Sequence, residues 1–598
     1  MAALVLDLRR NPSLISHVAI LRLVVVAELK DEDPRPSSRF VTARGCPVEN
    51  FNTAIRSAVL GLIVMANSSL LFAQTSPVVL LPEFRPVGGG GNNLHNPQLN
   101  ATPGAAEINL APLNFVRGTA NGPVTGPNAR LISNMIAGST GANGQDSDST
   151  DPVASAWLYV FGQFVDHDLD LESAPLSSEA INIPVLLGDP AFPAGTTIPM
   201  TRDARNPSTN TIVNTVAGYL DLSQLYGVTA DGAASLRNPD GTLKTEAGGE
   251  DLPIVNGAFI AGDPRVMENP ELSVVTILFM REHNRWVQQL RAQQPGWSGD
   301  QLYNMAKSIT TAEYQNVVYG EYLPVLIGNV LGSYRGYDDR VNAQVTQEFS
   351  TAAFRVGHSQ VSETQEGVDN NGNTLFAESL AQAFFNTATD DEANGINPLL
   401  RAIGLDSSQA TDVYTVPVLR NLLSAGLVGG GIDLIDLIAI DIQRERDVGL
   451  GSLNQTRRAI GLSPYSSFSQ LTSDTVLQQN LQIVYGNIDA VDLFIGGLAE
   501  NHARGAAVGP TLQAIIAKQF DALRNGDRFF WQNQKFDRAT AATIARTTLG
   551  DIIKRNTDTT TIATHVFLVP GTPVHRKPTV PGAPGRNHGH RQDQFIVR

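Results

Sequence analysis

The chain has 598 residues, of which 42% are hydrophobic, and its formal net charge is −15 at pH 7. This charge argues against nucleic acid and against an anionic membrane surface as partners, because both would repel the protein. The single cysteine, Cys46, excludes an intramolecular disulfide and metal centres built from several thiolates, such as zinc clusters and iron–sulfur centres.

Residues 1–73 are predicted to be a pre-region that ends in a secretory signal. A basic residue, an apolar stretch and small residues follow one another at about 56–73, which is typical of a signal peptide cleaved after Ala73. A membrane anchor or a buried helix is the alternative, but the stretch is short for a bilayer span. We therefore expect a secreted, extracellular or periplasmic protein without stable membrane insertion. Residues 74–92, which include the run Gly88–Gly91, are predicted to be a linker.

Residues 93–568 have the composition of one large folded domain, and their patterns are mainly helical. Strand patterns are few and short, and long loops such as 173–215 separate the helices. A Ser/Asp/Thr cluster at 146–151 is predicted to supply N-caps for the apolar helix that follows. Residues 569–598 are basic and rich in proline and glycine, which predicts a disordered tail. Helices are predicted at Ala154–Phe161, Glu271–Gln294, Leu302–Val330 with a break near Pro324, Gln347–Gln360, Leu434–Gln443, Asp489–Leu498 and Thr511–Arg524.

The stretch 161–172, FGQFVDHDLDLE, follows the first of these apolar runs and carries a dense polar cluster. Charges at the end of a buried helix are costly unless something compensates them. On a helix, Gln163, Asp166 and His167 share a face, and Asp168 is rotated by about 100° from His167. The pattern is compatible with a solvated helix end. It is equally compatible with a metal or cofactor site that has a carboxylate on a neighbouring face.

Arg355 lies three residues before His358, so the two side chains share a helix face. An arginine beside a histidine is unusual for a divalent-cation site, but it suits a ligand with its own carboxylates, such as haem. Gly357 would allow a bulky planar group to approach closely. His283, in the long helix predicted at 271–294, is interpreted as a structural histidine.

Two further segments carry charged pairs that could belong to the same site. Arg265 and Glu268 lie just before the long helix, and Asp441 and Arg444 are three residues apart on one predicted helix face. Taken alone, each pair is also compatible with ordinary surface or helix charges.

Eight motifs occur in one order: FGQFVDHDLD, LDLSQLYG, PRVMENPEL, LFMREHNRW, YGEYLPVLIG, FRVGH, IQRERDVGL and AKQFDALRNGDRFFW. Together they closely resemble the animal-type haem peroxidases (the peroxidase–cyclooxygenase superfamily), including bacterial secreted members, from about residue 93 to 568. The resemblance implies a large single-domain haem peroxidase fold that is mainly α, with long loops and little β structure. It also implies a haem-dependent enzyme that reduces hydrogen peroxide and oxidises small donors through a ferryl intermediate.

The resemblance implies roles for individual residues on the two sides of the haem. His167 looks like the distal histidine, which transfers a proton between the oxygens of peroxide, and Arg265 looks like the distal arginine. Gln163 matches the glutamine that hydrogen-bonds distal water. His358 looks like the proximal ligand of the haem iron.

Other matches concern the attachment of haem b and of Ca²⁺. Asp166 and Glu268 match the two carboxylates that form esters with the haem, and Arg355 and Arg444 match partners of the haem propionates. Asp170 acquires no role and is interpreted as a solvated helix-end acid. The Ca²⁺ ligands implied by the resemblance are Asp168, Asp221, Ser223 and the carbonyl groups of Ala217 and Tyr219.

Four positions depart from the family pattern. Asp441 replaces the proximal asparagine, which should make His358 more imidazolate-like and lower the iron potential. Ala217 replaces a common threonine, so the Ca²⁺ site loses one oxygen. Asn269 stands where the chloride-oxidising mammalian member has a haem-linked methionine, so neither a third haem bond nor chloride oxidation is expected. Val448 replaces a common histidine and is interpreted as neutral.

Bromide, iodide, thiocyanate or phenols are therefore the expected donors. The alternatives are a fatty-acid dioxygenase of the same superfamily, a non-catalytic extracellular protein that binds haem and serves adhesion, and a non-haem metalloenzyme. The cyclooxygenase branch has a radical tyrosine three residues before the proximal histidine. This chain has Arg355 there, which favours a peroxidase. A non-haem metal site would leave Arg265, Arg355 and Arg444 unexplained.

Overall fold

The computed structural model describes residues 80–572 except 115–123, 139–149, 173–178, 204, 207–208, 210, 385–394 and 426–431. All of these residues belong to the unit Thr75–Arg598. The predicted signal peptide and most of the predicted tail lie outside the described residues. No helix in the described part is long and apolar enough to cross a membrane.

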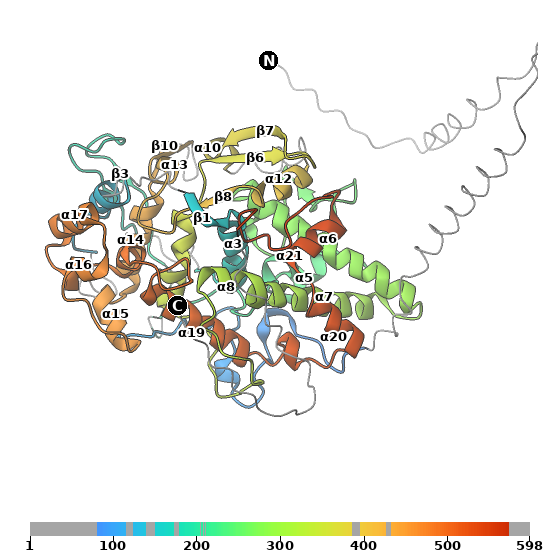
Figure 1. Cartoon of the computed structure of the whole chain (residues 1–598). Helices are drawn as coiled ribbons and strands as arrows, with labels where there is room; N and C mark the ends of the chain where they lie inside the picture. Colours follow the sequence, from blue (N-terminus) through green and yellow to red (C-terminus); the bar gives the residue numbers. More distant parts are fainter. Residues whose placement is uncertain are drawn as a thin grey trace, which may run out of the picture. The chain divides into compact units, whose positions relative to one another are not determined.

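The described part is built mostly from helices (Figure 1), which confirms the prediction of a mainly α fold. The α-helices are α2 (Ala129–Ile132), α3 (Trp157–Leu169), α4 (Ser223–Tyr226), α5 (Ala230–Ser235), α6 (Pro270–Gln293), α7 (Gly299–Val317), α8 (Leu323–Leu326), α9 (Gln347–Ser350), α10 (Leu380–Ala383), α12 (Ile396–Ile403), α13 (Pro417–Arg420), α14 (Leu437–Val448), α15 (Leu453–Ala459), α16 (Phe468–Leu471), α17 (Thr475–Tyr485), α18 (Leu493–Ala499), α19 (Pro510–Asn525), α20 (Arg538–Ile544) and α21 (Leu549–Asn556).

Shorter helical turns and small sheets complete the architecture. The turns are η1 (Val87–Gly89), η2 (Pro97–Leu99), η3 (Ser133–Ala137), η4 (Pro264–Met267), η5 (Val318–Tyr322), η6 (Ala353–Ser359), η7 (Ile488–Ala490) and η8 (Trp531–Asn533). The strands form antiparallel pairs: β1 (Thr150–Ser155) with β8 (Ser407–Gln409), β2 (Ile183–Pro184) with β3 (Thr197–Ile198), β4 (Ile254–Val255) with β5 (Ala258–Phe259), β6 (Thr364–Val368) with β7 (Thr374–Ser379), and β9 (Leu422–Ala425) with β10 (Ile432–Ile435).

Helix α3 packs against α6 and η6 and lies near the centre of the view in Figure 1. Its buried aromatic residues hold it there. Phe164 stacks on Phe279 of α6 with a centroid distance of 5.1 Å, and Phe161 meets Phe567 edge to face at 5.4 Å. Such aromatic pairs add about 0.5–1.5 kcal/mol each beyond the burial of their area. This packing fixes the orientation of the polar residues at the C-terminal half of α3.

The start of α3 differs from the prediction. Residues Thr150–Ser155 form strand β1 rather than a cap, and α3 begins at Trp157 after Ala156, which makes no side-chain capping bond. Strand β1 pairs with Ser407–Gln409, so a partner distant in sequence decides the conformation here. The predicted break near Pro324 is also wrong. The π-type turn η5 widens the backbone before α8, so the chain continues through a proline that has no N–H to donate.

Residues 80–92, predicted as part of a linker, pack against the domain. The Arg85 guanidinium lies 2.5 Å from the Asp527 carboxylate, and the Asn92 amide donates to the same carboxylate at 2.8 Å. Both Asn92 and Asp527 are buried. Ordered packing therefore begins before residue 93.

Candidate functional site

The C-terminal half of α3 meets the segment between η4 and α6. Gln163 donates from Nε2 to Oε2 of Glu268 at 3.1 Å, and its Oε1 accepts from Nδ2 of Asn269 at 2.9 Å. Nε2 of His167 lies 3.5 Å from the same Glu268 carboxylate. Asn269 also caps α6 by accepting from the backbone N–H of Leu272. The start of the long helix is thereby joined to the residues predicted for the distal side.

Arg265 is held by Asp263, a residue that the sequence reasoning missed. The guanidinium donates from Nε to Oδ1 at 3.0 Å and from Nη2 to Oδ2 at 2.5 Å, and Nη2 also donates to the carbonyl of Asp170 at 2.9 Å. Asp263 is the N-cap of η4 and is followed by Pro264. An Asp–Pro–Arg sequence at a helix start is the local signal that could have revealed this partner.

His167 is buried, and its environment favours the neutral imidazole. Burial lowers the pKa of His167 to about 3, and the nearby Arg265 guanidinium lowers it further while Asp263 opposes the shift. The usual histidine pKa is about 6.5. At neutral pH the ring therefore has an unprotonated nitrogen that can accept a proton.

The predicted proximal residues form a hydrogen-bonded group on η6 and α14. Nδ1 of His358 lies 2.6 Å from Oδ2 of Asp441, and Arg355 donates from Nη1 to Oδ1 of the same carboxylate at 2.9 Å. Asp441 is fully buried, which alone would raise its pKa, but His358 and then Arg355 lower that pKa below its usual value. The carboxylate orients the His358 ring and leaves Nε2 for a metal.

Several of these side chains border an enclosed space. Burial raises the pKa of Asp166 to about 6 and raises the pKa of Glu268, although the Glu268 side chain is 35% accessible. Accessible surface on a poorly hydrated carboxyl group indicates an internal cavity rather than bulk water. A Cβ added at Gly357 would meet no atom within 4 Å, so open space also exists beside His358. The residues present therefore fit the haem that the sequence implies.

The predicted propionate partners lie on the same side as the His358 group, and protein carboxylates are their partners here. Nη1 of Arg444 is 2.6 Å from Oδ1 of Asp203, and Nη2 of Arg355 is 3.9 Å from Oε2 of Glu172. Glu172 and Asp203 were not singled out from the sequence. These two arginines supply positive charge at the edge of the site.

The predicted Ca²⁺ residues also come together. The Asp168 carboxylate accepts from the backbone N–H groups of Asp221 at 2.9 Å and Ser223 at 2.6 Å, and from the Ser223 hydroxyl at 2.9 Å. The carbonyl groups of Ala217 and Tyr219 belong to the same loop, where they accept from the N–H groups two residues later. Oδ1 of Asp221 is buried without a hydrogen-bond partner in the described residues. An orphaned carboxylate oxygen beside hydroxyl and carboxylate oxygens fits a hard cation.

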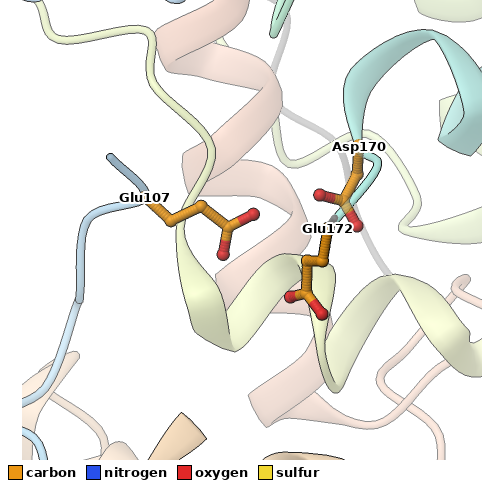
Figure 2. Close-up of side chains that lie close together, drawn as sticks. All are labelled: Glu107, Asp170 and Glu172. Atoms are coloured by element: carbon orange, nitrogen blue, oxygen red, sulfur yellow. The ribbon is translucent and has the colours of Figure 1, made fainter. Parts of the chain in front are cut away.

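Asp170 corrects a prediction, because it is not solvated. It is 6% exposed and lies beside Glu107 and Glu172 (Figure 2). Burial, and next the negative charge of Glu172, raises the pKa of Asp170 to about 7. Asp170 and Glu172 are two residues apart in an extended segment, so their shared side was readable. Nothing local in the sequence indicates Glu107.

His283 agrees with its interpretation as a structural histidine. Its Nδ1 lies 3.0 Å from the hydroxyl of Tyr226, and its Nε2 lies 3.0 Å from the carbonyl of Gly241. Both ring nitrogens are thus used inside the protein. The imidazole is fully buried on α6, away from the residues predicted for the haem site.

Comparison with known proteins agrees with this geometry. The chain is 32% identical over 513 residues to Peroxinectin A of Dictyostelium discoideum, covering 79% of this chain and 93% of that protein. It is 30% identical over 554 residues to human Eosinophil peroxidase, covering 81% and 76%. Among solved structures, Peroxidase A from Dictyostelium discoideum matches with a TM-score of 0.72 and 29% identity, covering 81% of this chain and 99% of that one.

A plant fatty acid alpha-dioxygenase, from Arabidopsis thaliana, matches with a TM-score of 0.70 over 85% of this chain and 88% of that one, at 18% identity. That likeness concerns the fold alone. A model of the family described as Animal haem peroxidase matches residues 84–567, which include the described site residues from both sides of the cavity. The chain belongs to the animal haem peroxidase family.

Proposed function

We propose that this peroxidase reduces hydrogen peroxide at the site between His167 and His358 and oxidises bromide, iodide, thiocyanate or phenols. The observation that carries the proposal is the contrast between the two histidines. His167 is buried and neutral beside an arginine, whereas His358 is hydrogen-bonded to a buried carboxylate through Nδ1. The first arrangement suits proton transfer and the second suits metal ligation.

The chain's own residues would divide the chemistry as follows. The haem, when bound through His358, supplies the iron that takes electrons from the donor to the peroxide. His167 accepts the proton of one peroxide oxygen and returns it to the departing oxygen, which leaves as water. Arg265 stabilises the negative charge that develops on that oxygen. Its Nε and Nη2 are fixed by Asp263, so the guanidinium is preorganised before substrate arrives.

An absorption spectrum tests this function. The purified protein is expected to show a Soret band that shifts when hydrogen peroxide is added and returns when iodide or a phenol is added. A band that does not respond to peroxide would support a non-catalytic haem-binding protein. Absence of a band after reconstitution with haem would rule out the proposed site.

The dioxygenase alternative has less support from the residues. The position three residues before His358 is Arg355, whose guanidinium is bound to Asp441 rather than left as a redox-active phenol. Incubation with palmitate and oxygen is therefore expected to give no oxygenated fatty acid. Detection of a 2-hydroperoxy product would favour the dioxygenase.

Asp166 and Glu268 are proposed to form esters with haem b. Both carboxyl groups border the cavity, and their raised pKa values keep part of the population protonated at neutral pH, as ester formation requires. We expect Asp166→Ala to lose the ester at that position, whereas Gln163→Ala, which alters a neighbour on the same helix, keeps it. Mass spectrometry of the haem peptides under denaturing conditions measures the linkage. Equal linkage in both variants would contradict the assignment.

The loop around Asp168 is proposed to bind Ca²⁺. A ligand that binds only the folded state stabilises it by about 2.7 kcal/mol at a hundred times its Kd. Calcium is therefore expected to raise the thermal midpoint of the natural protein, and Asp221→Asn should lose most of that increase because it removes a charged ligand. Calorimetry with and without a chelator provides the measurement. A full calcium response in Asp221→Asn would show that Ca²⁺ binds elsewhere.

Export, with a signal at about 56–73, remains part of the proposal, as do the folded domain, the linker and the tail. Support comes from the order of basic, apolar and small residues before Ala73. N-terminal sequencing of the mature protein tests the cleavage position.

A further inference from the structure

Three carboxyl groups gather at the end of α3, outside the set assigned to haem and to the Asp168 loop. Glu107, Asp170 and Glu172 each offer an oxygen, and these oxygens all lie within 4.8 Å of one another (Figure 2). Glu107 is 5% exposed, and the Glu172 side chain is 6% exposed. Three buried acids this close repel one another strongly unless positive charge or protons lie between them.

The described surroundings offer few donors to this cluster. The Ser350 hydroxyl lies 3.0 Å from Oε2 of Glu107 and 3.4 Å from Oε1 of Glu172, while Arg355 stays 3.9 Å from Glu172. Oε1 of Glu107 and Oδ1 of Asp170 are buried and have no hydrogen-bond partner in the described residues. Buried carboxylate oxygens without partners are costly, so they point to a missing ligand.

Asp203 gives independent support, because it approaches from a different segment. Its Oδ1 is bound by Arg444 at 2.6 Å, but its Oδ2 is buried and has no partner in the described part of the chain. Burial, and next the charge of Glu172, raises the pKa of Asp203 well above its usual value, so the two side chains face each other. The residue is 5% exposed. A fourth unsatisfied carboxyl group therefore borders the same space.

The available positive charge does not balance these acids. Arg355 is shared with Asp441, which itself holds His358, and Arg444 is shared with Asp447 at 3.6 Å. Two haem propionates at these arginines would add further negative charge. Either the acids share protons, or a cation lies among them. Oxygen ligands alone select hard divalent cations such as Ca²⁺, Mg²⁺ or Mn²⁺.

We propose that Glu107, Asp170 and Glu172, with Asp203 at the edge, form a second site for a hard divalent cation, distinct from the Asp168 loop. Such an ion would join the end of α3 to the N-terminal segment and to the neighbourhood of Arg355. It would thereby brace the two histidine-bearing elements against each other. The proposal does not depend on peroxidase turnover.

Equilibrium dialysis of the full-length holoprotein against Mn²⁺, followed by elemental analysis, tests this site. We expect Glu107→Gln to bind one equivalent fewer than the natural protein, and Asp203→Asn to bind the same ion more weakly. Loss of a charged ligand should weaken binding about a hundredfold or more. In the Asp221→Asn background, where the loop site is removed, the remaining equivalent should disappear when Glu107→Gln is added.

Glu348→Gln is the matched control, because Glu348 is a buried acid that accepts from the backbone N–H groups of Leu110 and Ala111 and lies outside the cluster. It should keep the full metal content. Unchanged stoichiometry in folded Glu107→Gln would overturn the proposal and show that the acids share protons. If Glu107→Gln fails to fold, the affinity of Asp203→Asn for Mn²⁺ decides, and an unchanged value overturns the site.

Discussion

Replacing His167 with alanine is expected to slow the reaction with hydrogen peroxide by about a hundredfold to ten-thousandfold, which is the usual range for loss of a general acid–base group. The imidazole is buried and neutral, so it accepts a proton without first having to lose one. Alanine can neither accept the proton nor return it to the departing oxygen. Stopped-flow measurement of the Soret change against peroxide concentration gives the second-order rate constant.

His283→Ala is the control for this experiment, because it removes another fully buried histidine from the same protein. Its ring bonds Tyr226 and Gly241 and takes no part in the cavity. We expect this variant to lose stability but to retain the rate constant of the folded fraction. The Soret intensity of His167→Ala should stay near that of the natural protein, since His358 still holds the iron. A rate within threefold of natural would remove His167 from its proposed role.

The elements that sequence patterns predict well are those whose signals are local. Helix α19 spans Pro510–Asn525 against a prediction of Thr511–Arg524, because an apolar face and a proline at the first position define it. Strand β1 was missed because its partner lies far along the chain in β8. Local propensity for capping lost there to a long-range pairing, and the helix start moved to Trp157 accordingly.

The same distinction applies to the site. His167, Arg265 and His358 were singled out because motifs around them occur in a specific order, and Asp263 beside Arg265 was readable from the adjacent Asp–Pro–Arg. Glu107 beside Asp170 was not, because the two meet only when the N-terminal segment packs against the end of α3. Asp170 was interpreted as solvated for the same reason. Burial of an acid depends on the fold around it, which its neighbours in sequence do not reveal.

Replacing Asp441 with asparagine should raise the Fe(III)/Fe(II) potential by about 60 mV or more, which corresponds to about a tenfold change in the equilibrium constant. Asp441 is fully buried, its pKa is held low by His358 and Arg355, and its carboxylate lies 2.6 Å from Nδ1 of His358. A charged acceptor at this distance increases the basicity of the ligand and favours the ferric state. An asparagine oxygen keeps the geometry but lacks the charge.

Asp447→Asn separates this local effect from the loss of any buried charge. Asp447 lies on the same helix, is 1% exposed and pairs with Arg202 and Arg444 instead of His358. A spectroelectrochemical titration of the Soret band should therefore show a clear upward shift for Asp441→Asn and a smaller one for Asp447→Asn. Equal shifts would mean that the potential senses only the total charge of α14. No shift in Asp441→Asn would mean that Arg355 already neutralises the carboxylate, so that His358 behaves as it would beside the family's asparagine.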